Sequence, residues 1–190
     1  MLLEVSGMVS QPADPEDKVV TLQVANFGDN VAIKSNDGNY SFSIASGTYI
    51  GKVFTGSSEA DTITNAGSEI KIAGSAGDDL IINSGDNVTI NGGEGDDSLW
   101  GGAGAETFIY QANEGTDTIT NYNYADGDIL RIFNADGMSG TYGNATFAND
   151  KLTLAIDGGG SVVFDGVSAG DSININNTTY EISNSELVKK

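Results

Sequence analysis

Large apolar residues recur every nine positions through the middle of the chain. Cut from residue 56 onward, the sequence gives six consecutive blocks of nine, and the eighth position of every block is apolar and large. These positions are Ile63, Ile72, Ile81, Ile90, Leu99 and Phe108. The first position of each block is Gly or Asn, which both suit turns. Such a block is too short for a helix with its connections, so each predicts a turn followed by a short strand.

The blocks alternate, so the full repeat is 18 residues long. The sixth position is Asp in the first, third and fifth blocks, but Ile70 and Val88 in the second and fourth. Two blocks would then form one coil of a parallel β-helix, with Asp61, Asp79 and Asp97 stacked along one edge. On the other edge, Ile70 and Val88 are expected to face inward as members of strand pairs.

Two further polar features fit this stacked arrangement. Asn65 and Asn83 lie one coil apart on the edge without aspartates and could pair as a hydrogen-bonded ladder. Residues 112–120 end in DTIT, as residues 56–64 do, and place Asp117 at 20 residues beyond Asp97. We therefore expect Asp117 to extend the aspartate row.

Stacked aspartates favour a bound cation. Neighbouring strands lie ~4.8 Å apart, so carboxylates in successive coils would repel one another and lose hydration. The chain has neither His nor Cys, so any metal would be a hard ion with oxygen ligands. Ca²⁺ takes about six to eight oxygens at roughly 2.3–2.6 Å, and the carbonyls of glycine-rich turns can complete such a set.

The best-formed blocks match a known repeat. Residues 92–100, GGEGDDSLW, fit the nonapeptide G-G-x-G-x-D-x-U-x, and residues 74–82 fit it with Ser75 in place of the second glycine. This pattern resembles the repeats-in-toxin (RTX) family of calcium-binding proteins. Residues 115–132 also resemble the sequence that commonly follows the last repeat in that family.

Two blocks depart from the family pattern. Residues 101–109 keep the glycines but have Glu106 where Asp is usual, and in residues 56–64 Ser57 and Glu59 replace two glycines. Serine carbonyls can serve as well as glycine carbonyls, and Glu59 could add a carboxylate.

The resemblance implies where ions would bind. In the family, each ion lies between two stacked turns and takes turn carbonyls and the sixth-position Asp of both. Carried over, this predicts Ca²⁺ between turns 56–61 and 74–79, a second ion between 74–79 and 92–97, and a third between 92–97 and 112–117. The implied ligand residues are Asp61, Asp79, Asp97, Asp117, Ser57, Glu59, Gly74, Ser75, Ala76, Gly77, Gly92, Gly93, Glu94 and Gly95.

The predicted fold class is all-β, a parallel β-roll with a C-terminal antiparallel β cap. We assign residues 47–120 to the calcium-binding roll, 1–46 to an N-terminal β segment or cap, and 121–190 to the C-terminal cap. Block 47–55 keeps the nine-residue register and puts Phe54 at its eighth position.

Residues 129–183 contain five strand-like runs and indicate a β-meander. The sequences DGGG (157–160) and NN (176–177) between these runs predict hairpin turns. Trp100 and most of the tyrosines are expected to be packing residues rather than platforms for a ligand.

Charge and composition exclude several kinds of function. The net charge is −19, from 27 acidic and 8 basic residues, so nucleic acid and anionic membranes are not expected partners. No apolar run approaches the ~18 residues of a membrane helix. Metalloprotease and lipase chemistry both need histidine, which the chain lacks, so we do not expect an enzyme.

These observations predict a calcium-binding module that gives calcium-dependent folding and stability to an exported bacterial protein, secreted or at the cell surface. The RTX resemblance implies type I secretion, and residues 1–10 lack the features of a secretory signal. The alternative is an accessory module for adhesion, with a surface polysaccharide or domains of a parent protein as partner. A monomer is expected.

Overall fold

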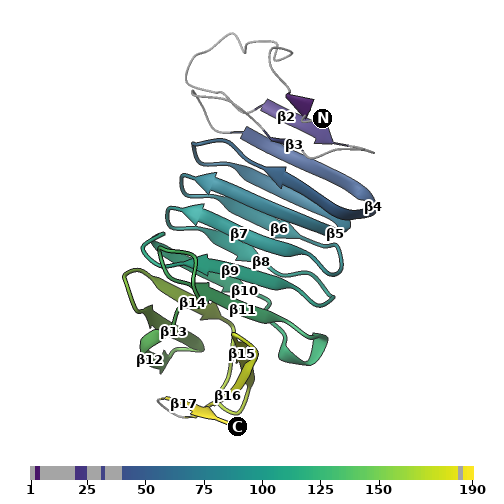
Figure 1. The fold of residues 1–190 in the computed structure, drawn as a ribbon. Helices are drawn as coiled ribbons and strands as arrows, with labels where there is room; N and C mark the ends of the chain where they lie inside the picture. Colours follow the sequence, from purple (N-terminus) through teal and green to yellow (C-terminus); the bar gives the residue numbers. More distant parts are fainter. Residues whose placement is uncertain (1–2, 5–19, 25–30, 33–39, 184–185) are drawn as a thin grey trace.

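The computed structural model describes residues 3–4, 20–24, 31–32, 40–183 and 186–190. Most of the predicted N-terminal segment, residues 1–46, therefore lies outside the described residues. Within the described part, almost every element is a strand, and the strands stack as successive rungs from one end of the molecule to the other (Figure 1).

The stack is built from strands β1 to β11. They are β1 (Leu3–Glu4), β2 (Val20–Val24), β3 (Val31–Ala32), β4 (Tyr40–Thr55), β5 (Thr62–Ala76), β6 (Leu80–Asn83), β7 (Thr89–Glu94), β8 (Ser98–Trp100), β9 (Thr107–Gln111), β10 (Thr116–Thr120) and β11 (Ile129–Phe133). The remaining elements are the 3₁₀ helix η1 (Tyr124–Asp126), β12 (Tyr142–Ala148), β13 (Lys151–Ile156), β14 (Ser161–Asp165), β15 (Ser172–Ile175), β16 (Thr178–Ile182) and β17 (Leu187–Lys189).

The strands of the stack pair in parallel with a repeat of 18 residues, as predicted. On the first sheet, Ile63 pairs with Ile81, and Ile81 with Leu99. On the second sheet, Ile72 pairs with Ile90, and Ile90 with Phe108. Each coil therefore adds one strand to each sheet, and the fold is a parallel β-roll.

The core lies between the two sheets and consists of the eighth-position residues and their neighbours. Ile63, Ile81 and Phe108 are completely buried, and Ile70 and Val88 also face inward, as predicted. Phe54 is buried beside Ile72, so block 47–55 does keep the repeat register. Removal of this apolar surface from water is the main stabilisation of the stack, at about 25 cal/mol per Å².

Trp100 corrects one expectation. It was predicted to be a packing residue, but its side chain is 46% exposed on the outer face of β8. Because side chains alternate along a strand, the inward position of Leu99 directs its neighbour outward. Tyr110, in contrast, is buried, as expected of a packing residue.

The C-terminal strands do not form one simple meander. β11 pairs in parallel with β9 and β15, and β14 pairs in parallel with β10, so the parallel stacking continues past residue 120. Two antiparallel units are attached to this parallel stack, β12–β13–β14 and β15–β16–β17. The meander prediction was right for these two units and wrong for β11, which belongs to the roll.

Both predicted hairpin turns are present. The turn at 157–160 joins β13 to β14, and Asn176 and Asn177, both with positive φ, join β15 to β16. Paired positive φ values of this kind suit the tight turns that match strand twist. In the described part of the chain, no helix is long and apolar enough to cross a membrane.

Candidate metal centre

The four sixth-position aspartates form a continuous row along one edge, here named the aspartate edge, made by turns 56–61, 74–79, 92–97 and 112–117. All four side chains are at most 2% exposed. The backbone amide of Asp61 donates to Oδ1 of Asp79 at 2.7 Å, and that of Asp79 donates to Oδ1 of Asp97 at 2.8 Å.

Asp117 belongs to the same row despite the two extra residues before it. The backbone amide of Asp97 donates to Oδ1 of Asp117 at 3.3 Å, and Thr118 pairs with Ser98 in the first sheet. The two additional residues, Tyr110 and Gln111, are the end of strand β9. The structure therefore confirms the predicted position of Asp117 as a fourth stacked aspartate.

Two carboxylate oxygens in this row have no partner. Oδ2 of Asp79 and Oδ2 of Asp97 are fully buried and accept no hydrogen bond. An unsatisfied buried polar atom costs about 1–3 kcal/mol, and more when it is charged. These two atoms are therefore positions on the aspartate edge that favour a positively charged ligand.

Turns 74–79 and 92–97 begin with glycine, which leaves room beside these two oxygens. A Cβ at Gly74 would overlap Oδ2 of Asp79 and the carbonyl oxygen of Gly92, and a Cβ at Gly92 would overlap Oδ2 of Asp97. At turn 74–79 a carboxylate oxygen and a carbonyl oxygen of the next coil thus lie near the same point, and both are ligand types that hard cations prefer.

Other turn residues carry their carbonyls toward the next coil. A Cβ at Gly93 would overlap the carbonyl oxygen of Ser75, and a Cβ at Gly95 would overlap that of Gly77. Ala76 and Glu94 lie in the same turns, and the Glu94 side chain is exposed. The predicted set in turns 74–79 and 92–97 is therefore brought together.

The first turn is different from the others. The Ser57 backbone amide donates to Oδ2 of Asp61 at 2.6 Å, and the Ser57 hydroxyl donates to Oδ1 at 3.0 Å. Glu59 is exposed, and its backbone amide donates to the Ser57 hydroxyl. Ser57 thus bonds to both oxygens of the Asp61 carboxylate, whereas Oδ2 of Asp79 and Oδ2 of Asp97 have no partner.

Burial has a large effect on the acidity of the row. It raises the pKa of Asp79 to about 8, with further increases from the charges of Asp97 and Asp61. Burial likewise raises the pKa of Asp97 to about 6 and, together with the charge of Asp97, that of Asp117 to about 9. Without a cation, the row therefore binds protons near neutral pH.

A second, exposed row of acids was missed by the sequence reasoning. The Asp96 backbone amide donates to Oδ1 of Asp78 at 2.9 Å, and the Thr116 amide donates to Oδ1 of Asp96 at 2.7 Å. Both acids occupy the fifth position of their blocks, which was the available signal. Their charges raise the pKa of Asp97 and make the edge more attractive to cations.

The opposite edge, made by turns 65–70, 83–88, 101–106 and 121–128, begins with amides. The Asn65 side-chain amide donates to Oδ1 of Asn83 at 2.7 Å and to the Gly67 carbonyl at 2.7 Å. The Asn83 amide donates to the Gly85 carbonyl. The predicted asparagine ladder is confirmed, and both of its side-chain amides bond to protein groups.

Further along that edge the amides give way to buried acids. Glu106 and Asp128 are each 1% exposed, and the Glu106 backbone amide donates to Oδ1 of Asp128 at 2.8 Å. Burial, followed by the charge of Asp128, raises the pKa of Glu106 to about 7. Neither residue was predicted as a ligand, although Glu106 stands at the sixth position of its block.

The oxygen atoms on the aspartate edge determine how a metal ion would be bound. Among the described residues, no group of three or more His, Cys, Asp and Glu side chains could hold a metal ion. An ion on the aspartate edge would therefore take two carboxylates and several turn carbonyls. This set fits a hard cation and does not fit a site built from side chains alone.

The chain shows little similarity to known proteins in sequence and a distant similarity in structure. No family model matches the chain, and no curated protein matches its sequence. Among solved structures, the extracellular lipase LipA from Serratia marcescens matches with 18% identity and a TM-score of 0.42, over 79% of this chain and 36% of the lipase. The chain thus spans about a third of the lipase's length, and its fold assignment rests on its own strand pairing.

Proposed function

We propose that this chain is an RTX-type calcium-binding β-roll, a module that gives calcium-dependent folding and stability to an exported bacterial protein. The observation that carries the proposal is the pair of buried, unpartnered oxygens, Oδ2 of Asp79 and Oδ2 of Asp97. Oδ2 of Asp79 lies close to Gly74, near the carbonyl oxygen of Gly92, and Oδ2 of Asp97 lies close to Gly92. A hard divalent cation would satisfy both kinds of oxygen together.

The three predicted ion positions are not equivalent. The position between turns 74–79 and 92–97 has both unpartnered carboxylate oxygens and is the best supported. The position between turns 92–97 and 112–117 has the carboxylates of Asp97 and Asp117, and the pKa of Asp117 is raised to about 9. Between turns 56–61 and 74–79, Ser57 already occupies the Asp61 carboxylate, so an ion there would have to displace or share those bonds.

The proposed role follows from linkage. An ion that binds only the folded chain stabilises it by mass action, and stacked carboxylates without ions destabilise it. Extracellular modules bind calcium at about 10⁻⁴–10⁻³ M, so the roll would fold outside the cell and stay loose inside. Export and a location outside the cell are part of this proposal.

Circular dichroism with calcium titration tests the proposal. After chelation, we expect the far-ultraviolet β-signal to appear with Ca²⁺ in the millimolar range or below, and magnesium at equal concentration to have little effect. Asp79→Asn should shift the midpoint to higher calcium, whereas Asp78→Asn, which changes an exposed acid in the same turn, should shift it much less. A signal that is complete in chelator and unchanged by calcium would contradict the proposal.

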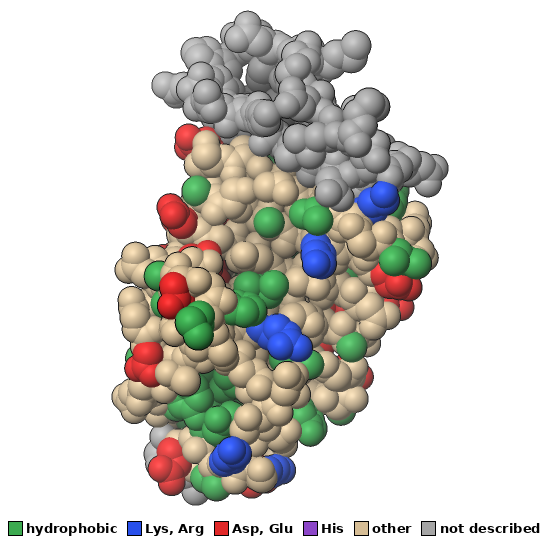
Figure 2. Space-filling view, viewed as in Figure 1, with side chains coloured by type: hydrophobic (Ala, Val, Ile, Leu, Met, Phe, Trp, Pro, Cys, Tyr) green, Lys and Arg blue, Asp and Glu red, His purple; other side chains and the backbone are tan. Residues whose placement is uncertain are grey.

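A second candidate is an accessory role in adhesion. Its support is a concavity of about 410 Å³ in the C-terminal part, lined by Tyr142, Asn176, Thr178 and Tyr180 among others. The two tyrosine rings lie 5.8 Å apart in an edge-to-face contact, and such aromatic walls suit sugar rings. A neutral rather than an anionic polysaccharide would be the partner, because the chain has 8 basic residues against 27 acidic ones and Figure 2 shows no broad basic patch on the face in view.

This second candidate has its own test. A glycan array probed with the calcium-loaded chain should give binding that Tyr180→Ala removes, with unchanged circular dichroism. Absence of binding to any neutral glycan would leave the folding module as the sole proposal.

A further inference from the structure

Asn91 is the one asparagine of the chain that glycine follows. The backbone nitrogen of the residue after an asparagine can attack the side-chain amide carbon, and glycine leaves that nitrogen least hindered because it has no Cβ. All other asparagines precede larger residues, as Asn83 precedes Ser84. The sequence Asn91–Gly92 is therefore more able to rearrange chemically than any other asparagine position of the chain.

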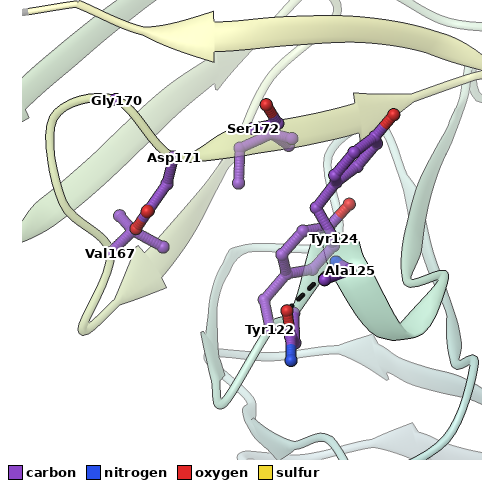
Figure 3. Close-up of a pocket in the computed structure, with 9 residues that line it drawn as sticks. Tyr122, Tyr124, Ala125, Val167, Gly170, Asp171 and Ser172 are labelled. Carbon is purple, nitrogen blue, oxygen red and sulfur yellow. Dashed lines mark hydrogen bonds between the residues drawn. The ribbon is translucent and has the colours of Figure 1, made fainter.

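The side-chain carbonyl of Asn91 is not fixed by a hydrogen bond. Its Oδ1 is buried and has no partner. In contrast, Oδ1 of Asn83 accepts from the backbone amide of Gly85 at 3.0 Å. Asn123, which lines the concavity drawn in Figure 3, is fixed in the same way: the dashed line marks the bond that the Ala125 backbone amide donates to its Oδ1 at 3.0 Å. The amide group of Asn91 is thus freer to turn toward the backbone.

The strand that contains Asn91 prevents this attack in the folded chain. Asn91 belongs to β7 and pairs with Ala73 on one side and with Ile109 on the other. In a paired strand the backbone is extended, and its amides take part in the ladder. The Gly92 nitrogen can reach the side-chain carbon only after the backbone turns at Asn91, which breaks both pairings. The reaction therefore requires opening of this part of the roll.

We propose that Asn91–Gly92 is a site of spontaneous deamidation, which proceeds when the roll is open and stops when it is closed. The Gly92 nitrogen forms a bond to Cγ of Asn91, the bond from Cγ to Nδ2 breaks, and the side-chain nitrogen leaves as ammonia with the proton of the Gly92 amide. Water then opens the five-membered succinimide. Hydrolysis at Cγ gives aspartate, and hydrolysis at the backbone carbonyl gives isoaspartate, whose main chain runs through the side-chain carbons.

Isoaspartate at this position is expected to prevent the roll from closing. It adds one atom to the main chain between the buried Ile90 and Gly92. Gly92 is tightly packed, because its own Cβ would overlap Oδ2 of Asp97, and its carbonyl oxygen would lie 2.5 Å from a Cβ at Gly74. A backbone shift here thus displaces one turn of the aspartate edge against the next. The new carboxylate also places a charge at a half-buried position.

The modification makes a long-lived open state irreversible. Under the proposed function, the time that a chain spends without calcium is the time during which Asn91 can react. Calcium would then protect the chain chemically as well as stabilise its fold. The chemistry itself requires only that β7 opens, so it does not depend on what closes the roll.

Peptide mapping by mass spectrometry tests the site in the full chain, incubated at mildly alkaline pH in calcium, in chelator and in urea. In urea, we expect residue 91 to deamidate roughly tenfold or more faster than Asn83 or Asn123, because glycine follows it. In calcium, we expect its rate to fall roughly tenfold or more, because a closed strand opens rarely. Fragmentation of the peptide distinguishes isoaspartate from aspartate.

Two results would overturn this proposal. One is a rate at residue 91 in urea that is no higher than the rate at Asn83. The other is an equal rate in urea and in samples that circular dichroism shows to be folded. A chain that is folded and unreactive in chelator as well as in calcium would instead contradict the proposed function and support protection by the fold alone.

Refolding provides a second readout, with two variants as controls. When the chain is held in urea and then diluted into calcium, the recovered β-signal should decrease in step with the isoaspartate content. Asn91→Ala, which cannot form the succinimide and matches Ala73 one coil earlier, should recover fully at all times. Asn91→Gln, which would have to close a six-membered ring, should recover as well. An equal loss of signal in both variants would contradict the proposed effect on closing.

Discussion

The backbone amide of Asp79 donates to Oδ1 of Asp97 at 2.8 Å, one full coil away, and leaves Oδ2 of Asp97 buried without a partner. One carboxylate thus has two functions: one oxygen maintains the register of the stack, and the other remains available to a ligand. Substitution by Asn preserves an oxygen for the first function and removes the charge needed for the second.

Asp79→Asn should therefore change stability in opposite directions with and without calcium. In chelator at neutral pH, the variant should be more stable than the unmodified chain, because folding no longer has to protonate Asp79 or bury its charge. In calcium, it should be less stable, with a midpoint for calcium-induced folding raised roughly tenfold or more, because ligand charge controls calcium affinity over several decades. Urea unfolding in both buffers checks this, and a change of the same sign in both would contradict it.

The metal-free roll should lose stability as the pH rises. The folded chain keeps the pKa of Asp79 near 8, against 3.8 ordinarily, and that of Asp97 near 6. Between the ordinary pKa of Asp79 and its raised pKa in the fold, the folded state binds more protons than the unfolded state. The free energy of unfolding in chelator therefore falls from about pH 4 to pH 8. Unfolding in chelator at pH 5 and pH 8 measures the difference, and greater stability at pH 8 would be inconsistent with these pKa values.

Calcium binding should release protons at neutral pH. The same raised pKa values, and that of Asp117 near 9, mean that the unloaded row is partly protonated at pH 7. Cations displace those protons because metal-binding carboxylates must be ionised. Calorimetric titration in two buffers of different ionisation enthalpy gives the number released, which should fall in Asp79→Asn.

Ser75→Gly should stabilise the chain. Ser75 has a φ of 104°, where a side chain is strained, and the equivalent position one coil on is Gly93 with a φ of 112°. Relief of such strain is worth about 1 kcal/mol. The reverse change, Gly93→Ser, should destabilise the chain by more than this, because its Cβ would overlap the Ser75 carbonyl. Thermal unfolding in saturating calcium compares the two.

Asn83→Ala should destabilise the roll equally with and without calcium. Asn83 accepts from the Asn65 amide and the Gly85 backbone amide and donates to the Gly85 carbonyl. Loss of these buried bonds leaves groups unsatisfied at a cost of about 1–3 kcal/mol each. The shift in urea midpoint should be the same in calcium and in chelator, which separates this edge position from Asp79.

The sequence was most informative where the chain repeats itself. A fixed spacing of 18 residues brings Ile63 to Ile81 and Asp61 to Asp79 whatever lies elsewhere, so the register, the aspartate row and the asparagine ladder could be predicted. Trp100 could also have been placed outside, because its neighbour Leu99 was already assigned to the core.

Prediction failed where the repeat spacing is lost. Asp128 lies 22 residues after Glu106, so periodicity did not indicate that the two acids meet. Likewise, Thr116 of β10 pairs with Ser161 of β14 although three other strands lie between them in the chain, and no local pattern predicts such a pairing.

The Ser57–Asp61 contact has a consequence for how the roll assembles. In coil 56–73, Ser57 occupies the Asp61 carboxylate on one edge, and Asn65 satisfies the Gly67 backbone on the other. This coil can thus form with its polar groups satisfied before any cation arrives. Under the proposed function, we expect this coil to fold first and to serve as a template for each later coil as that coil binds its ion, which would give folding a direction along the stack.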